Sequence, residues 1–219
     1  MINLNKYDAV IFDMDGVLVD SEPLWKIAMH NVFLSLGSDL KKNDFQKTVG
    51  LRIDEVIYYW KNIEKWTPEV DEIEKQIVDK MIELINHQAM PLPGVLETLN
   101  YLNSKKPIAL ASSSPLSLIK AVLNKLKINS FFNVIHSAEQ ESHGKPHPAV
   151  FIGAAVKLDV RPENCLVIED SLNGVIAGKA ARMDVVSIPE KTHLVNTKMN
   201  LADFQFNNMN SFLKDLKNS

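Results

Sequence analysis

Residues 9–16 constrain the fold more than any other stretch, because the apolar run AVIF is followed directly by DMDG. A short apolar run with β-branched residues predicts a strand buried on both faces, as in a parallel sheet. Asp13 and Asp15 then face the same way if extended geometry persists. Ligands of an open parallel sheet bind outside the carboxyl ends of its strands, so both carboxylates are predicted at the mouth of a crevice. The same residues also fit an ordinary strand with a polar turn, since Asp-Gly is a common turn dipeptide.

Strands and helices alternate over most of the remaining sequence. Short apolar runs at residues 108–111, 134–135, 166–168 and 185–188 predict strands, and apolar residues at helical spacing predict helices between them. This βαβα order predicts an α/β fold, a Rossmann-like and mostly parallel sheet with helices on both faces. A chain of 219 residues allows one such domain with a sizeable insertion.

Residues 20–90 interrupt the alternation, because they show helical periodicity and no strand pattern. We therefore predict a core domain of residues 1–17 and 91–219 and an inserted α-helical domain of residues 18–90, here called the cap. Ser21 is the predicted N-cap of its first helix, and Trp60 and Trp66 fit packing positions in its interior. The connections at residues 17–21 and 88–94 are predicted hinges.

Charge and cysteine content argue against several classes of protein. The net charge of −3 provides no basic field for nucleic acid. A single cysteine, Cys165, excludes an internal disulfide, and its apolar neighbours predict a buried packing residue. No stretch resembles a signal peptide or a membrane span. We expect a cytoplasmic, monomeric protein without nucleic-acid or membrane partners.

Polar residues at the predicted strand ends belong to one chemical set. They are Asp13 and Asp15, Ser112 and Ser113, Lys145 in a loop, and Glu169 and Asp170. The carboxyl ends of parallel strands share one edge of the sheet, so these residues are expected to converge. Clustered carboxylates suit Mg²⁺, a serine before a helix offers donors to a phosphate, and a lysine offsets the negative charge. Such a set fits phosphoryl transfer, with Asp13 able to attack phosphorus and Asp15 able to exchange protons.

Four stretches, taken in order, resemble the motifs of the haloacid dehalogenase superfamily. They are FDMDGV at residues 12–17, ASSS at 111–114, GKPHP at 144–148 and VIEDS at 167–171. The helical insertion after the first motif resembles the α-helical cap of that superfamily. Further details are similar to its bacterial sugar-phosphate phosphatases, of the 2-deoxyglucose-6-phosphate and hexitol phosphatase type.

This resemblance implies a role for each residue of the set. Asp13 would be the nucleophile and a Mg²⁺ ligand, and Asp15 the general acid/base, binding Mg²⁺ through its backbone carbonyl. Asp170 would complete the metal site, with Glu169 as a further ligand. The implied phosphate-binding residues are Asp13, Met14, Asp15, Ser112, Ser113 and Lys145.

Assignments within the cap are less specific. Arg52 and Glu22 are expected to face the substrate, although an arginine at a helix edge is more often solvent-exposed. His143 and His147 flank Lys145, but the oxygen-rich surroundings argue against a zinc site, and both are read as loop residues.

The main functional hypothesis is a Mg²⁺-dependent phosphatase acting on small sugar or polyol phosphates through an aspartyl-phosphate. A phosphomutase of the β-phosphoglucomutase type shares every motif. That group carries a cap histidine near the position of Trp25, and its imidazole could direct attack by a sugar in place of water. Trp25 provides no imidazole, so the sequence favours hydrolysis. Haloacid dehalogenation would need no acid/base at Asp15, and a degenerate binding protein would lack a motif residue; all are present here.

Overall fold

A six-stranded parallel sheet forms the centre of the computed structural model, which describes residues 1–41, 44–48, 50–189 and 197–218. The spatial order β3-β2-β1-β4-β5-β6 confirms the predicted Rossmann-like α/β class. The strands are β1 (Ala9–Phe12), β2 (Ile108–Ser112), β3 (Val134–Ser137), β4 (Cys165–Glu169), β5 (Asp184–Ser187) and β6 (Phe204–Gln205). The last strand, β6, has only two residues, too short a run for an apolar pattern to predict.

Helices cover both faces of the sheet. One face packs against α4 (Val95–Asn103), α5 (Leu116–Leu126) and α8 (Met209–Lys217), the other against α6 (Ala149–Lys157) and α7 (Leu172–Ala180). Neighbouring residues of one strand point to opposite faces: Val10 belongs to the first cluster and Ile11 to the second. No helix in the described part of the chain combines the length and the apolar run needed to cross a bilayer.

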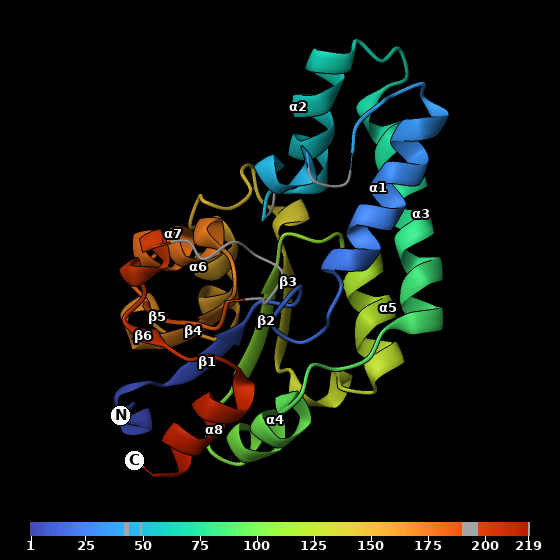
Figure 1. The fold of residues 1–219 in the computed structure, drawn as a ribbon. Helices are drawn as coiled ribbons and strands as arrows, with labels where there is room; N and C mark the ends of the chain where they lie inside the picture. Colours follow the sequence, from blue (N-terminus) through green and yellow to red (C-terminus); the bar gives the residue numbers. More distant parts are fainter. Residues whose placement is uncertain (42–43, 49, 190–196, 219) are drawn as a thin grey trace.

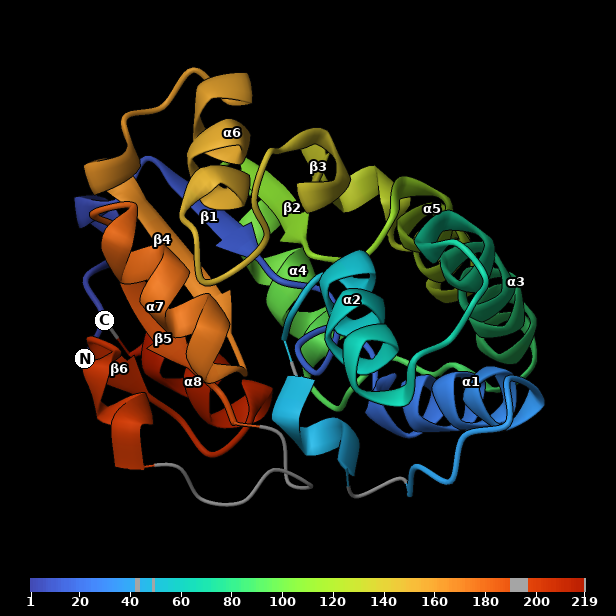
Figure 2. The same cartoon turned by 90° about the horizontal axis from the view of Figure 1, so that it is seen from above.

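The described residues of the insertion after β1 form three long helices and a short 3₁₀ turn. These are α1 (Glu22–Ser35), the turn η2 (Asp44–Thr48), α2 (Ile53–Glu64) and α3 (Val70–Gln88). Figure 1 shows them grouped beside the sheet, and from above α2 lies between the sheet and the pair α1 and α3 (Figure 2). Trp60 and Trp66 are 2% and 7% exposed, which confirms them as interior residues. Val19 bridges to both Asp15 and Pro91, so the two connections run side by side; whether residues 18–90 move as a unit stays a prediction.

The strand register brings the polar strand ends to one level. Phe12 pairs with Leu110 of β2 and with Ile168 of β4. The residues that follow these three in the sequence are Asp13 after β1, Ala111 in β2 and Glu169 in β4. The N–H of Asp13 still donates to the carbonyl of Ile168, at 3.0 Å. Asp13 therefore extends the β1 ladder by one residue, and its position is fixed by backbone hydrogen bonds.

Cys165 should be inert toward thiol reagents in the folded protein. The side chain is buried, and desolvation, with smaller effects of Asp8 and Glu163, raises the pKa of its thiol to about 12. Because only the thiolate reacts, we expect labelling near neutral pH to be at least ~10³-fold slower than for a free cysteine. A chromogenic disulfide reagent, with and without urea, measures this; one thiol titrating rapidly in the folded protein would contradict it.

Candidate active site

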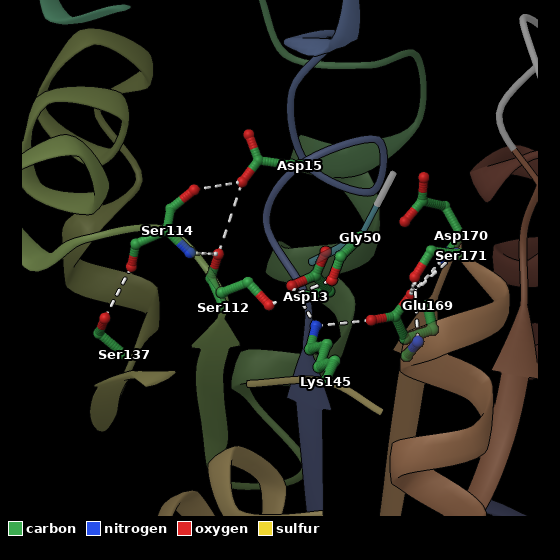
Figure 3. Close-up of polar contacts among 12 residues, drawn as sticks. Asp13, Asp15, Gly50, Ser112, Ser114, Ser137, Lys145, Glu169, Asp170 and Ser171 are labelled. Atoms are coloured by element: carbon green, nitrogen blue, oxygen red, sulfur yellow. Dashed lines mark hydrogen bonds and ion pairs between the residues drawn. The ribbon is translucent and has the colours of Figure 1, made fainter. Parts of the chain in front are cut away.

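Lys145 lies between two carboxylates at the centre of the site. Its Nζ donates to Asp13 Oδ1 at 2.7 Å and to Glu169 Oε1 at 2.6 Å. Lys145 is 2% exposed, Asp13 6% and Glu169 0%. Buried charges of this kind persist only when each is paired and hydrogen-bonded. Three residues from distant parts of the sequence thus form one buried charge cluster (Figure 3).

Glu169 is held by the beginning of α7 as well as by Lys145. Its Oε2 accepts hydrogen bonds from the backbone N–H groups of Asp170 and Ser171, both at 2.9 Å, and from Ser171 Oγ at 3.1 Å. The positive end of the helix dipole adds to this stabilisation. A Cβ on Gly174 would lie 1.7 Å from Glu169 Oε1. Only glycine at this position therefore leaves room for the Glu169 carboxylate.

Burial and neighbouring charge shift the pKa values of the cluster. Desolvation is the largest influence on Asp13; although Lys145 opposes it, the charges of Glu169 and Asp15 add to it, and the pKa of Asp13 rises to about 7. Desolvation also disfavours the charged form of Lys145, but Asp13 and Glu169 outweigh this and raise its pKa above the ordinary value. Lys145 is therefore a cation, placed where it neutralises Asp13.

Asp15 accepts hydrogen bonds at both carboxylate oxygens, from the first turn of the cap and from the end of β2. Ser21 Oγ and Trp25 Nε1 donate to Oδ1, at 2.5 and 3.0 Å. Ser114 Oγ donates to Oδ2 at 2.7 Å, and Ser112 Oγ lies 3.5 Å from it. These donors fix the carboxylate between core and cap. Figure 3 shows the two contacts from the end of β2, with Ser112 and Ser114.

Three of these contacts differ from what the sequence indicated. Ser21 occupies the N-cap position of α1, as predicted, but it makes no side-chain capping hydrogen bond, and its hydroxyl donates to Asp15. The indole of Trp25 and the hydroxyl of Ser114 were not predicted to contact Asp15. The third serine of ASSS was a usable signal for Ser114, whereas nothing local to Trp25 indicates the direction of its N–H group.

A cation could be held where Asp13, Glu169 and Asp170 meet. Each offers a carboxylate oxygen, and these oxygens lie within 4.8 Å of one another. A Cβ on Gly16, which has φ +74°, would lie 2.2 Å from Asp170 Oδ2, so glycine keeps the space beside that carboxylate open. Hard oxygen ligands fit Mg²⁺. Both carboxylate oxygens of Glu169 also accept hydrogen bonds, from Lys145 and from the N–H groups of Asp170 and Ser171.

A cavity of about 100 Å³ lies above this cluster. Its floor is formed by core residues: Asp13, Asp15, Gly16, Ser112, Ser113, Ser114, Lys145, Asp170 and Ser171. Its roof is formed by the cap, where Glu22 and Thr48 are polar and Trp25, Met29, Phe45, Leu51, Ile53 and Val56 are apolar. The Met14 side chain is wholly buried, so only its backbone is available to a ligand.

Arg52, like the buried Met14, is a predicted substrate contact that does not line the cavity. Its Nε and Nη2 donate to the two carboxylate oxygens of Asp54, both at 2.7 Å. Its Nη1 donates to the carbonyls of Ala138 and Glu141, at 3.0 and 2.9 Å. The guanidinium therefore contacts a loop of the core in place of the substrate space.

Comparison with known proteins gives consistent matches over most of the chain. Residues 10–188 match the haloacid dehalogenase-like hydrolase family. Hexitol phosphatase B of Escherichia coli (strain K12) is 38% identical over 212 residues, covering 95% of this chain and 96% of the relative. The phosphorylated carbohydrates phosphatase of Thermotoga maritima is 31% identical over 178 residues, covering 81% and 82%. The crystal structure of β-phosphoglucomutase from Clostridium difficile is similar in fold, with a TM-score of 0.82, 24% identity and 97% coverage of both chains.

Proposed function

This chain belongs to the haloacid dehalogenase-like hydrolase family and is a phosphoric monoester hydrolase, and we propose that it is a Mg²⁺-dependent phosphatase of small sugar or polyol phosphates. The observation that carries the proposal is the buried Asp13–Lys145 pair beside Asp170, on the floor of a cavity with a cap as its roof. A carboxylate nucleophile, a fixed cation and a further carboxylate are what transfer of a phosphoryl group to Asp13 requires.

In the first step, an Asp13 oxygen attacks the phosphorus atom, and the bond between phosphorus and the sugar oxygen breaks. Lys145 keeps Asp13 in place and offsets the charge that gathers on the phosphoryl oxygens. Ser112 and the N–H of Ser113 bind those oxygens from the end of β2. Asp15 gives a proton to the departing sugar oxygen. To reach that oxygen, the Asp15 carboxyl group must exchange one of its present hydrogen bonds, with Ser21 or Ser114, for a hydrogen bond to the substrate.

In the second step, water attacks the phosphorus of the aspartyl-phosphate. Asp15 takes one proton from that water, the bond between Asp13 and phosphorus breaks, and inorganic phosphate leaves with Asp13 restored. Asp13, Asp170 and the backbone carbonyl of Asp15 would hold Mg²⁺, with Glu169 orienting Lys145. When bound, Mg²⁺ supplies positive charge that neutralises and aligns the phosphate.

A sugar or polyol phosphate is the substrate class that fits best. The relatives named above act, by their names, on hexitol phosphates and on phosphorylated carbohydrates. Glu22 and Thr48 in the cavity roof can accept hydrogen bonds from hydroxyl groups, and the apolar side chains around them can pack against carbon. We propose that Glu22 contacts the sugar and that residues 18–90 move away as a cap to admit it.

Removal of the metal should abolish turnover. Phosphate release from a panel of sugar, polyol and aryl phosphates is measured with Mg²⁺, after EDTA, and after Mg²⁺ is restored in excess over EDTA. We expect activity with Mg²⁺, loss of activity with EDTA and recovery when Mg²⁺ is restored. Without the metal, the negative charge of the phosphate lacks its neutralising cation. Full activity in EDTA would overturn the metal dependence. Conversion between glucose phosphate isomers without phosphate release would favour a mutase, and chloride release from a haloacid would favour a dehalogenase.

A further inference from the structure

One short segment of the cap contacts three separate loops of the core. In this docking segment (residues 50–55), the Gly50 carbonyl lies 3.5 Å from Ser113 Oγ, in the loop after β2. A Cβ on Gly50 would lie 3.0 Å from Ser171 Oγ, in the loop after β4. Glu55 Oε1 accepts from the N–H of Gly144 at 3.3 Å, in the loop that carries Lys145. Each of these loops contributes residues to the cavity floor.

Arg52 makes the most specific contact of the docking segment. The bidentate pair with Asp54 fixes the plane of the guanidinium and raises the pKa of Arg52. Nη1 is thereby directed at the carbonyls of Ala138 and Glu141, at either end of one short turn. The side chain is 18% exposed, so these hydrogen bonds are largely shielded from water. Charge-assisted bonds of this kind are stronger than neutral ones.

The core loop that Arg52 contacts is itself firmly held. Glu141 Oε1 is 2.7 Å from Nε2 of His136, which is 2% exposed. Glu139 Oε2 accepts from the N–H of Leu116 at the start of α5, also at 2.7 Å. The same loop continues through Gly144 directly into Lys145. An interaction with this loop therefore acts on the residue that positions Asp13.

We infer that Arg52 is a positioning residue that docks the cap on the Lys145 loop, and that it acts without touching the substrate. With Asp54 as its orienting partner and Glu55 on Gly144, it favours the closed arrangement and fixes the loop in which Lys145 stands. Its effect on turnover rests on the proposed function, whereas its effect on closure does not. The bonds from Nη1 exist only when the cap is docked, so their loss should shift the ratio of closed to open cap roughly tenfold to hundredfold.

The closure effect is measurable as a distance between spin labels. Cysteines placed at Tyr58 on α2 and Val156 on α6, 57% and 69% exposed, accept labels, while buried Cys165 does not. Arg52→Ala is expected to move the distance distribution of the ligand-free protein toward longer values. Gly144→Ala should do the same with Arg52 intact, because its Cβ would lie 2.8 Å from Glu55 Oε2 and 3.0 Å from Arg52 Cβ. Arg161→Ala, a charge control on the core with a 75% exposed side chain, should leave the distribution unchanged.

Turnover separates positioning from substrate binding. We expect both docking variants to lose roughly tenfold to hundredfold in kcat/KM, in parallel with the shift in distance. If Arg52 binds substrate, Arg52→Ala raises KM but leaves the distance distribution unchanged, and Gly144→Ala keeps the kcat/KM and the distances of the unaltered protein. That result overturns the inference. If no phosphate ester is hydrolysed by any form, the proposed function fails, and the distances still decide whether Arg52 docks the cap.

Discussion

Replacing Asp13 by asparagine is expected to lower kcat by a factor on the order of 10⁴ or more. The substitution keeps the size of the side chain and an oxygen for Lys145, which lies 2.7 Å away. It removes the carboxylate charge, so no anionic oxygen remains to attack phosphorus. The measurement is phosphate release under saturating Mg²⁺ from whichever ester the unaltered enzyme turns over fastest.

Asp20→Asn is the matched control, because Asp20 is an exposed carboxylate at the cap connection. It should keep its activity within about twofold, since an exposed carboxylate away from the cavity makes no contact that the reaction needs. Circular dichroism of Asp13→Asn should match that of the unaltered protein. Wild-type rates in a correctly folded Asp13→Asn protein would exclude Asp13 as the nucleophile. Loss of activity in Asp20→Asn alone would mean that the essential carboxylate is Asp20 and not Asp13.

The core of the site could be predicted from sequence because strand order and register determine it. Asp13 and Glu169 each follow an apolar run, and parallel strands place such positions at one edge. The sequence predicted that Lys145 would meet carboxylates at this edge, but its burial and its contact with Glu169 were not predicted. The fold class was likewise readable from the alternation of strands and helices.

Contacts between cap and core could not be predicted, because they depend on how segments distant in the sequence meet in space. Ser21 stands at the N-cap of α1 as its sequence position indicates, yet its hydroxyl donates to Asp15, a contact that the helix pattern does not predict. Arg52 was expected in the substrate space, but Asp54, two residues further along the helix, holds its guanidinium on the core loop. Neither outcome is encoded in local periodicity. Both result from the position of α1 and α2 relative to the strand ends.

Replacing Lys145 by methionine should reduce both stability and activity strongly. Methionine fills similar space without charge, so the buried carboxylates of Asp13 and Glu169 lose the cation between them. Removing one partner of a buried ion pair costs about 3–5 kcal/mol. Without the lysine to position Asp13 and offset phosphate charge, kcat should also fall by roughly 10³. Urea unfolding in EDTA measures the stability change without metal binding.

The stability loss should depend on pH in a direction that follows from Asp13. In the native protein desolvation already raises its pKa to about 7 against the lowering effect of Lys145, so the variant should raise that pKa further. A folded-state pKa above the unfolded value means that the folded form binds the proton more tightly, and stability is lost as pH rises through the folded pKa. The pKa of Lys145 is raised, so its own contribution in the native protein is fully present below its ordinary pKa and does not change over this range. The difference between the two proteins should therefore grow from about pH 6 to about pH 8.5.

Lys75→Met provides the matched control for that comparison. Lys75 pairs with Asp79 on the surface of α3, where both side chains are well exposed, at 79% and 64%. Exposed pairs contribute at most about 1 kcal/mol, so the control should lose little stability and show no growing penalty with pH. If the Lys145→Met protein is as stable as the control at about pH 6 and at about pH 8.5, Asp13 and Glu169 do not depend on this cation. The charge cluster would then no longer support Asp13 as a nucleophile held ready for phosphate.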